Sequence, residues 1–528
     1  MVSPRDTYSE HRTRLIATCR ELLGDGRLLV ASNRGPVEYE FAPDGKVLPR
    51  RGRGGLMAGL GTVGQFGKIT WVASAMGEAD RKAAQEAGDG LIRSPLPGLN
   101  INVRFVVCPR NTYHKYYNVF SNPLLWFLQH HMWNSPYTPN IDASTYDAYQ
   151  NGYVAVNRAF AQAIVEEMAK SGCPRIAILH DYQLYLVAKM VREQMPEALL
   201  LHQVHVPWPS PSFWQLLPAS MRREICEGLC GNDIVGFQTA RSARAFLHTV
   251  QAFLDEAEVD HKGQTISYRG RQVKAAAYPI SIDVPSIRRA ASSARVREHQ
   301  ERLQSLCSEF AIVRVDRIDP SRNIVRGFRA YEILLERHPE LRGRAKFLAF
   351  LTPSRARVRE YQRNVDELMA TVNGLNERYA TTGWRPVELF MENNYLQALA
   401  GLRLYDVLLV NSVVDGMNLA AKEGPIVNTR AGVVILSEGT GAFEQLREGT
   451  LVVAPTDLEA TARAMYEGLT MAPEERQRRA ELLRRLVEEE DIAMWLLHQF
   501  ADLLALARAR GPLAAVSQRE AALPPVQP

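Results

Sequence analysis

Short apolar runs alternate with longer segments of mixed apolar and charged residues along most of the chain. The runs lie at 28–32, 69–74, 103–108, 176–179, 199–206 and 234–237, and then at 311–315, 347–351, 387–391, 407–410, 433–436 and 451–454. Short apolar runs with helical segments between them are typical of βαβ units and buried parallel sheets. The two sets of runs predict an α/β fold with two doubly wound domains.

The division between the two predicted domains is expected near 283–304. There an apolar strand at 275–282 gives way to Pro285 and then to a polar, arginine-rich helix. We therefore assign residues 27–285 to an N-terminal domain and residues 286–480 to a C-terminal domain.

The two ends of the chain are expected to lie outside these domains. Residues 1–26 are predicted to form an amphipathic helical extension that ends at Gly24-Asp25-Gly26. Charged residues interrupt its apolar positions, so it lacks the continuous apolar core of a secretory signal. Residues 481–510 are predicted to form a C-terminal helix that packs back on the N-terminal domain. Residues 511–528, rich in Ala, Pro and Gln, are predicted to be a disordered tail.

Composition narrows the class of protein. The 528 residues include 63 basic and 58 acidic ones, so the net charge is +5, and 46% are hydrophobic. This much apolar surface can fill large cores, which excludes a disordered chain. No window approaches the ~20 apolar residues that span a bilayer, so no membrane contact is expected.

The six cysteines are scattered and form no CxxC pair. Cys226 and Cys230 lie one helical turn apart, and we interpret them as buried thiols rather than metal ligands. We therefore expect a reducing, cytoplasmic location.

Candidate ligand-binding residues follow the predicted strands of the first domain, because ligands collect at the carboxyl ends of parallel strands. Ser32-Asn33-Arg34 and the glycine- and arginine-rich stretch 50–55 follow the first strand. That stretch is either a phosphate-binding loop or an ordinary basic surface hairpin. His180-Asp181 and His205 end two further strands, and an Asp and a His at such positions suit hydrogen bonds to a polyol.

In the second domain, Arg317 and Arg322 follow a strand and are five residues apart. They could clamp a diphosphate, or they could belong to a salt-bridge network with Asp316 and Asp319. Arg355 follows the next strand and adds a third cation.

The segment 411–423 is the most informative one. A strand ends, a glycine-containing turn opens a short helix, and Gly424-Pro425 are expected to stop it. The amides at the helix start form an anion site. Asp415 and Glu423 are predicted to lie on one side, where they accept hydrogen bonds from sugar and ribose hydroxyls. The alternative is an ordinary helix with Asp415 as its cap.

At these residues the sequence resembles the trehalose-6-phosphate synthases, which are retaining glycosyltransferases with two Rossmann-like domains facing a central cleft (the GT-B fold). The resemblance runs from about Leu28 to about Leu504. It is carried by Ser32-Asn33-Arg34, Gly54-Gly55-Leu56, the stretch from Tyr117 to Trp126, His180-Asp181-Tyr182, His205-Val206-Pro207, Gly236-Phe237-Gln238-Thr239, Tyr278-Pro279-Ile280 and Asp415-Gly416-Met417-Asn418-Leu419.

The resemblance implies a role for each matching residue. Those implied to hold the phosphorylated acceptor, glucose 6-phosphate in the family, are Arg34, Tyr117, Trp126, Asp181 and Arg355. Those implied to hold the nucleotide-sugar donor are Gly54, Gly55, His205, Arg317, Arg322, Asp415, Gly416, Met417, Asn418, Leu419 and Glu423. Those closest to the chemistry are Asp181, His205, Arg317, Arg322 and Asp415.

The implied reaction retains the anomeric configuration. Arginines and helix amides stabilise the departing nucleoside diphosphate, and the leaving phosphate takes the proton of the attacking hydroxyl. Neither a metal nor a cofactor is implied beyond the nucleotide-sugar cosubstrate.

The sequence also departs from the family pattern. The usual Asp-Tyr-Ser-Lys-Gly is here Asp319-Pro320-Ser321-Arg322-Asn323, and Gln183 replaces a histidine. Pro320 and Asn323 resemble the related pseudoglycosyltransferase that makes validoxylamine 7′-phosphate from a nucleotide-activated cyclitol and an aminocyclitol phosphate.

Several alternatives stay open. They are that pseudoglycosyltransferase reaction, a glucosylglycerol-phosphate synthase reaction and a non-catalytic sugar-phosphate sensor. The donor base (UDP, GDP or ADP) and a homo-oligomeric state are open as well. The pI near 8.8 permits nucleic-acid binding. No nucleic-acid partner is expected, because the arginines sit at separate strand ends rather than in a basic stripe.

Overall fold

The computed structural model describes residues 4–52, 55–88, 90–170, 175–354 and 359–510. The chain forms two compact units. The C-terminal unit comprises Pro279–Ile492 with Met1–Tyr8, and the N-terminal unit comprises Ser9–Tyr278 with Ala493–Pro528. The chain thus passes from one unit to the other a little before the expected division at 285/286. The predicted tail 511–528 lies outside the described residues.

The N-terminal unit is built on a ten-stranded sheet in the order β10-β11-β12-β9-β8-β7-β1-β4-β6-β5. Its strands are β1 (Arg27–Ser32), β4 (Lys68–Ser74), β5 (Leu91–Ile92), β6 (Ile101–Val106), β7 (Ile176–His180), β8 (Leu199–Gln203), β9 (Ile234–Phe237), β10 (Glu258–Asp260), β11 (Thr265–Tyr268) and β12 (Arg271–Ala277). The strands from β12 to β6 are parallel, and antiparallel strands close both edges. The predicted apolar runs are the buried inner strands, as expected for a sheet covered on both faces.

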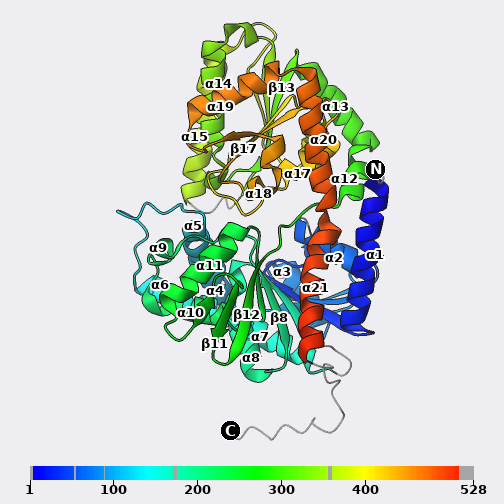
Figure 1. Ribbon diagram of the computed structural model, residues 1–528, viewed down its shortest axis with the longest axis vertical. Helices are drawn as coiled ribbons and strands as arrows, with labels where there is room; N and C mark the ends of the chain where they lie inside the picture. Colours follow the sequence, from blue (N-terminus) through cyan, green and yellow to red (C-terminus); the bar gives the residue numbers. More distant parts are fainter. Residues whose placement is uncertain (1–3, 53–54, 89, 171–174, 355–358, 511–528) are drawn as a thin grey trace, which may run out of the picture. The chain divides into compact units, whose positions relative to one another are not determined.

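Helices lie against this sheet (Figure 1). They are α1 (Pro4–Leu23), α2 (Gly55–Gly64), α3 (Glu78–Glu86), α4 (Arg110–His114), η1 (Lys115–Trp126), α5 (Phe127–Gln129), α6 (Ala143–Ala148), η2 (Tyr149–Val154), α7 (Ala155–Met168), η3 (Tyr182–Leu184), α8 (Val187–Gln194), α9 (Pro211–Trp214), α10 (Ala219–Leu229), α11 (Ala240–Phe253) and α21 (Ile492–Arg510). α1 ends at Leu23 and Gly24 follows with φ +53°, the left-handed conformation that terminates helices.

Two π-helices, η1 and η2, pack against each other in the N-terminal unit. Gly152 of η2 approaches the backbone so closely that a methyl group there would lie 2.6 Å from the Tyr116 nitrogen. Phe120 and Tyr153 fill the contact, with ring centroids 4.8 Å apart. Such wide turns are uncommon and often occur at functional sites.

The C-terminal unit is built on a fully parallel six-stranded sheet in the order β15-β14-β13-β16-β17-β18. Its strands are β13 (Phe310–Arg317), β14 (Ala345–Thr352), β15 (Val387–Phe390), β16 (Val407–Val410), β17 (Val433–Ser437) and β18 (Leu451–Val453). The order reverses direction between β13 and β16, which is the switch point where doubly wound sheets bind ligands. The α/β fold with two doubly wound units is therefore confirmed.

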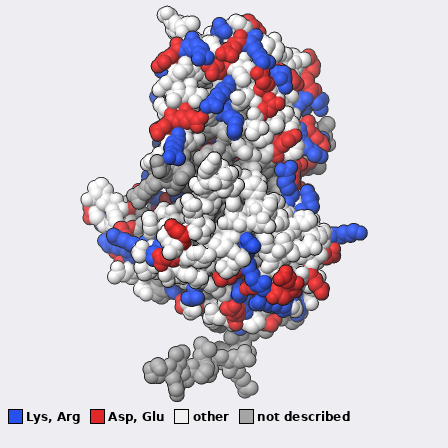
Figure 2. Space-filling model, turned by 90° about the vertical axis from the view of Figure 1, so that its left-hand side faces the viewer, with Lys and Arg blue, Asp and Glu red and all other residues white. Residues whose placement is uncertain are grey.

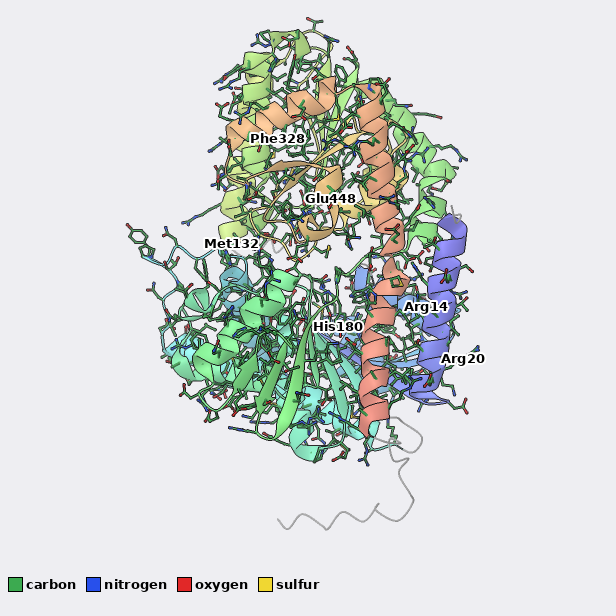
Figure 3. All side chains as sticks on the ribbon, in the orientation of Figure 1. Arg14, Arg20, Met132, His180, Phe328 and Glu448 are labelled. Atoms are coloured by element: carbon green, nitrogen blue, oxygen red, sulfur yellow. The ribbon has the colours of Figure 1, made fainter. Side chains whose placement is uncertain are left out.

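The helices of the C-terminal unit cover both faces of its sheet (Figure 1). They are α12 (Val284–Ala291), α13 (Ala294–Leu306), η4 (Pro320–Arg322), α14 (Ile324–Arg337), η5 (Pro339–Leu341), α15 (Arg359–Tyr379), α16 (Tyr395–Leu404), α17 (Ala420–Val427), α18 (Phe443–Leu446), η6 (Arg447–Gly449), α19 (Leu458–Thr470) and α20 (Pro473–Glu489). One core lies under α14, α15 and α19, where Phe328, labelled in Figure 3, packs on Phe347, and Phe347 also packs on Tyr331.

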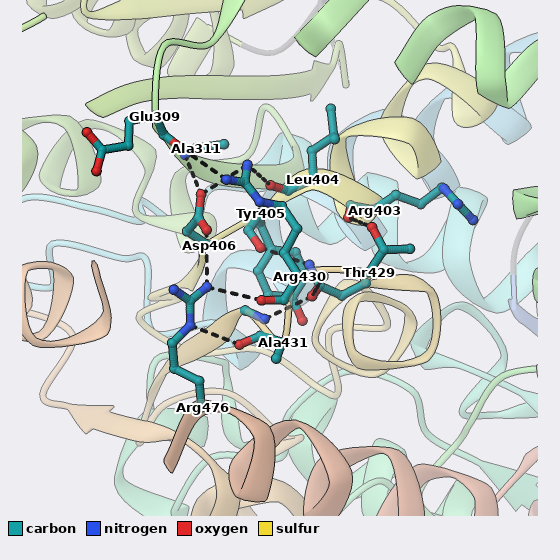
Figure 4. A network of polar contacts seen from close by, with 12 residues as sticks. Glu309, Ala311, Arg403, Leu404, Tyr405, Asp406, Thr429, Arg430, Ala431 and Arg476 are labelled. Atoms are coloured by element: carbon teal, nitrogen blue, oxygen red, sulfur yellow. Dashed lines mark hydrogen bonds and ion pairs between the residues drawn. The ribbon is translucent and has the colours of Figure 1, made fainter. Parts of the chain in front are cut away.

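A buried carboxylate ties the amino ends of β13 and β16 together (Figure 4). Asp406 precedes β16 and accepts a 2.9 Å hydrogen bond from the Ala311 nitrogen in β13. Arg430 and Arg476 pair with the same carboxylate at 3.2 and 3.1 Å. Because the carboxylate is almost fully buried, the two guanidiniums supply the compensation that a buried charge needs.

The C-terminal segment forms two helices rather than the single helix expected over 481–510. α20 ends at Glu489, and α21 begins at Ile492, so the second helix belongs almost entirely to the N-terminal unit. In that unit α21 lies beside α1, and the Arg508 Nε donates to Glu21 at 2.9 Å (Figure 1).

The stretch Pro473–Arg510 is long and apolar enough, by length and composition, to cross a membrane. The expectation that no window approaches a membrane span is corrected in that respect. Several large apolar side chains of α21, including Trp495, Phe500 and Leu503, are nevertheless buried inside the protein. A core helix satisfies the same test for the same physical reason, which is a continuous apolar surface.

Candidate active site

Two neighbouring strand ends of the N-terminal unit, those of β7 and β8, carry the predicted residues Asp181 and His205. Asp181 follows β7 with φ +73°, a conformation that non-glycine residues rarely adopt. Its carbonyl accepts a hydrogen bond from His202 Nε2 at 3.0 Å, and its carboxylate accepts one from the backbone nitrogen of His205 at 3.3 Å. The structure therefore brings Asp181 and His205 together, because the strands that they follow, β7 and β8, are neighbours in the sheet.

His205 has both ring nitrogens engaged within the N-terminal unit. Its Nε2 lies 3.1 Å from His180 Nδ1, and its Nδ1 lies 3.0 Å from Gln238 Nε2. Desolvation lowers the pKa of His205 to about 4 and that of His202 to about 3. These imidazoles are therefore neutral near pH 7, although the His205 side chain is partly accessible.

Arg34 and Tyr117, two predicted acceptor ligands, lie near each other in the N-terminal unit. The Arg34 side chain is 63% exposed and bonds to Glu38 at 3.2 Å. Partial desolvation lowers the pKa of Arg34, but the Tyr117 hydroxyl and the Glu38 carboxylate raise it by more. The net pKa is therefore above the usual value, and the guanidinium stays charged. Tyr117 stacks on Tyr113, with ring centroids 5.6 Å apart.

The predicted acceptor ligand Trp126 ends the π-helix η1 and is only 3% exposed. It stacks on His130 at 3.8 Å between ring centroids. Most of its ring therefore serves the packing of the N-terminal unit.

The glycine- and arginine-rich stretch after β1 forms the surface hairpin β2 (Val37–Phe41) and β3 (Val47–Arg51). Arg50 pairs with Glu40 on the neighbouring strand and stays exposed. Arg50 therefore lies in the surface hairpin of the second alternative, and a phosphate-binding role for the stretch stays a prediction. Gly54 lies outside the described residues, as does the predicted acceptor ligand Arg355, and Gly55 is the first residue of α2.

In the C-terminal unit the residues after β13 form a buried charge network. Arg314, fully buried, donates from Nε to Asp316 at 2.9 Å, and its Nη2 donates to the carbonyl of Arg322. The Arg322 guanidinium pairs with Asp415, and its Nε lies 3.9 Å from Asp316. Burial lowers the pKa of Arg322, and the Asp316 carboxylate opposes that effect. Arg317 ends β13 and is exposed.

The salt-bridge interpretation of these residues thus holds for Arg322. Its guanidinium is paired with Asp415, which the sequence places almost a hundred residues later. Arg322 and Asp415, both predicted donor ligands, are therefore neighbours at the switch point of the sheet. A diphosphate bound here would therefore contact an Arg322 guanidinium that is already paired with Asp415.

The loop after β16 differs from its prediction in two ways. Asp415 does not cap the helix, because α17 begins at Ala420 with Leu419 before it. Asp415 also lies outside the helix, so helical spacing does not relate it to Glu423. The loop is held instead by the 439–442 segment, since the nitrogens of Asp415 and Gly441 bond to the carbonyls of Gly439 and Asp415 at 3.0 Å.

Two glycines allow this close approach. A methyl group on Gly439 would overlap the Val413 carbonyl, and one on Gly441 would overlap the Gly416 carbonyl. In the same loop Asn418 adopts a left-handed conformation (φ +73°), and Met417 accepts a hydrogen bond from Ala442 at 2.9 Å. The loop conformation therefore depends on the absence of side chains at these two positions.

Helix α17 continues past the expected stop at Gly424-Pro425 and ends at Val427. Pro425 costs the helix only one hydrogen bond, and the Asn428 nitrogen still bonds to the Gly424 carbonyl at 2.9 Å. On this helix Glu423 accepts a 3.3 Å bond from Tyr395, and desolvation raises the Glu423 pKa to about 7. The neighbouring Lys422 is fully buried and donates to the Ile280 carbonyl at 2.9 Å.

The matching family covers nearly the whole chain. The family model described as glycosyltransferase family 20 matches residues 26–505. The chain belongs to glycosyltransferase family 20. The two predicted domains and the resemblance drawn from the site motifs agree with that membership.

Two named relatives are similar to the chain along most of its length. An α,α-trehalose-phosphate synthase (UDP-forming) A of Dictyostelium discoideum is 29% identical over 480 residues, which are 89% of this chain and 61% of that relative. A validamine 7-phosphate valienyltransferase of Streptomyces hygroscopicus subsp. jinggangensis is also 29% identical, over 90% and 94% of the two chains.

A solved α,α-trehalose-phosphate synthase (UDP-forming) of Burkholderia xenovorans, in complex with glucose 6-phosphate, matches with a TM-score of 0.75. It is 28% identical and covers 90% of this chain and all of its own. The fold is therefore that of the GT-B family 20 synthases. The present chain is shorter than the Dictyostelium relative and spans about three fifths of its length.

Several residues of the two sites carry no role in the sequence-based prediction. Arg314 and Tyr395 fall outside every motif, and Lys422 lies in the segment 411–423 without an assigned role; only their contacts show that they support Arg322, Glu423 and α17. His180 and Gln238 stand inside predicted motifs, but the bonds that they make to His205 depend on which strands are neighbours. Among the described residues, no group of three or more His, Cys, Asp or Glu side chains could hold a metal ion.

The buried histidines predict a stability that falls in acid. His202 is fully buried and its pKa lies near 3 rather than 6.5, so the unfolded chain takes up a proton more readily than the folded one. Stability should be complete above about pH 6.5 and decrease as the pH falls toward 4, by on the order of 2 kcal/mol at pH 5 for this residue. Denaturant unfolding between pH 8 and pH 4.5 measures this.

The matched variant is His202→Gln, whose amide can donate to the Asp181 carbonyl but does not titrate. It should unfold at a similar denaturant concentration at pH 8 and lose less stability than the wild type at pH 5. Parallel pH profiles for the two proteins would contradict a proton-linked role for His202.

The close approach of the 439–442 segment predicts that Gly441→Ala is strongly destabilising. A methyl group cannot fit beside the Gly416 carbonyl, so the loop must move, at a cost of about 3 kcal/mol or more. Gly374→Ala is the control, because Gly374 lies in α15 with open space around it and should stabilise by about 0.5–1 kcal/mol. Urea unfolding of both variants tests the difference; equal midpoints would refute the steric constraint.

Proposed function

We propose that the protein is a retaining glycosyltransferase that moves glucose from a nucleotide-glucose donor to glucose 6-phosphate. The products are α,α-trehalose 6-phosphate and a nucleoside diphosphate. The observation that carries the proposal is the pairing of Arg322 with Asp415 at the switch point of the C-terminal sheet in a family 20 chain. UDP as the nucleotide and glucose 6-phosphate as the acceptor are supported by the similarity to UDP-forming trehalose-phosphate synthases, one of them solved with glucose 6-phosphate.

In this proposal the C-terminal unit holds the donor. Arg317 and Arg322 face the diphosphate, and the amides of Gly416, Met417, Asn418 and Leu419 add hydrogen bonds beside the start of α17. Asp415 holds sugar hydroxyls, and Glu423 accepts from the ribose diol. The cationic side chains offset the charge that develops as the bond from the anomeric carbon to the diphosphate breaks.

The acceptor ligands in this proposal are residues of the N-terminal unit together with Arg355, which belongs by sequence to the C-terminal unit. Arg34 and Arg355 pair with the phosphate of glucose 6-phosphate, while Tyr117, Trp126 and Asp181 orient the sugar. His205 contacts the donor sugar, and Gly54 and Gly55 allow close approach of the donor phosphates. The acceptor hydroxyl attacks the anomeric carbon on the face from which the diphosphate leaves, and the leaving phosphate oxygen takes the hydroxyl proton.

We further propose a setting that fits this chemistry. The reaction needs no metal or cofactor, because arginines and amides carry the positive charge. The described cysteines are free thiols, so we place the protein in the reducing cytoplasm. The proposal includes no nucleic-acid or membrane partner, and it allows a homo-oligomer. On the face of the molecule shown in Figure 2, basic and acidic side chains are intermixed rather than gathered in a basic stripe.

A pseudoglycosyltransferase reaction is the second candidate, and one observation favours it. Asn323, which differs from the usual family glycine, bonds through its side chain to the carbonyls of Asn411 and Pro455 at 2.8 and 2.6 Å. The valienyltransferase relative is aligned over 94% of its length. In that reaction the donor would be a nucleotide-activated cyclitol and the acceptor an aminocyclitol phosphate.

Purified protein should release nucleoside diphosphate and form a disaccharide phosphate when given glucose 6-phosphate and at least one of UDP-, GDP- or ADP-glucose. Nucleotide release and mass spectrometry of the product measure both. Turnover only with a nucleotide-cyclitol and an aminocyclitol phosphate would select the second candidate. Absence of both products with every donor would contradict the first.

Arg317→Ala should lower kcat/KM for the donor by roughly 100-fold, because a cation facing the departing diphosphate is lost. Arg317 is exposed, so the variant should unfold at the same temperature as the wild type. The control is Arg329→Ala, which removes an exposed arginine of α14 paired with Glu367. An unchanged kcat/KM for the donor in Arg317→Ala would show that Arg317 does not act on the donor diphosphate.

A further inference from the structure

A chain of hydrogen bonds crosses three neighbouring strands of the N-terminal unit. Gln238 follows β9, His205 lies just beyond β8, and His180 is the last residue of β7, labelled in Figure 3. The strands lie side by side in the order β9-β8-β7. The chain runs from Gln238 Nε2 to His205 Nδ1 at 3.0 Å and from His205 Nε2 to His180 Nδ1 at 3.1 Å.

The direction of these hydrogen bonds follows from the first donor. An amide nitrogen only donates, so His205 Nδ1 accepts and the single proton of the neutral ring sits on Nε2. That N–H donates to His180 Nδ1, which places the proton of neutral His180 on its own Nε2. Gln238 therefore determines the tautomer of both histidines.

This series of hydrogen bonds ends at a buried nitrogen of His180. His180 is 1% exposed, and its Nε2 is buried without a hydrogen-bond partner among the described residues. A buried donor without an acceptor costs roughly 1–3 kcal/mol. An apolar side chain could fill the same space without this cost. The hydrogen bond that His180 Nδ1 accepts from His205 is therefore the contact that explains a histidine at this position.

We propose that His180 is a positioning residue that, together with Gln238, fixes the tautomer and the orientation of His205. His180 is enclosed while His205 is partly accessible, so His180 acts on a ligand only through His205. The functional part rests on the proposed function, in which His205 contacts the donor sugar. Because Gln238 and His180 engage both ring nitrogens, the His205 ring is held in one orientation, so its contact with the donor sugar has one geometry instead of several.

The tautomers themselves are measured by NMR of the full-length protein labelled with 15N-histidine. The His180 and His205 signals are assigned by their loss in His180→Asn and His205→Gln. Wild-type protein should show a proton on Nε2 and a bare Nδ1 at both histidines. A protonated Nδ1 on His205 would overturn the proposal, whether or not the protein turns over any substrate.

Gln238→Glu supplies the sharper test because it keeps the shape and removes the donor. A carboxylate only accepts, so the His205 proton must move to Nδ1, and His180 must then donate from its own Nδ1. Both histidines should change tautomer together in the NMR spectrum. A variant in which either histidine keeps its Nε2 proton contradicts the coupling.

Kinetics of two variants of His180 test the positioning role. His180→Asn keeps an acceptor oxygen near the place of Nδ1, whereas His180→Leu has a similar volume and no acceptor. We expect the donor KM to be roughly tenfold higher in His180→Leu than in His180→Asn, which corresponds to one lost hydrogen bond. The acceptor KM should differ by less than about twofold. Equal donor KM values in the two variants would overturn the positioning role.

Discussion

The buried charge network of Arg314, Asp316, Arg322 and Asp415 is the constraint on which the C-terminal site depends. It joins the turn after β13 to the loop after β16, the two segments on either side of the switch point. Arg314 is fully buried and pairs with Asp316, so removal of that carboxylate leaves a charge that the surrounding apolar core cannot solvate. The same pairing orients Arg322, so the stability of the site and its electrostatic character come from one set of contacts.

In both sheets a buried aspartate joins the amino ends of two neighbouring strands. Asp233 precedes β9 and accepts from the Leu200 nitrogen of the neighbouring strand at 2.8 Å, as Asp406 does from Ala311. Arginines surround each carboxylate, with Arg192 at 2.9 Å from Asp233. Each unit thus fixes the start of one strand with a compensated buried charge. The carboxyl ends of the strands carry the predicted ligand-binding residues, and the sheets support the strained backbone at Asp181 and Asn418.

The sequence predicts the strands of the two sheets better than it predicts the side-chain contacts between distant segments. Strands such as Ile234–Phe237 and Val407–Val410 coincide with their apolar runs, because burial on both faces leaves one pattern. The π-helix Lys115–Trp126 could not be predicted, since its wide turns depend on the approach of Gly152 from a second helix. Helix α17 passes through Pro425 because its last turn loses only one bond. The Arg322–Asp415 and His205–Gln238 contacts depend on strand order, which local patterns do not encode.

The departures from the family motif after β13 form a consistent set. Asn323 adopts a left-handed conformation (φ +62°), which asparagine tolerates better than most residues, so it can stand where the family usually has glycine. Its side chain adds bonds to the loop after β16, which a glycine could not make. Arg322 replaces a lysine, and its planar fork reaches Asp415 while its Nε faces Asp316, whereas a single ammonium offers no such spread of donors. Substitutions that keep the backbone path and add contacts are those expected of a working site, not of a degenerate sensor.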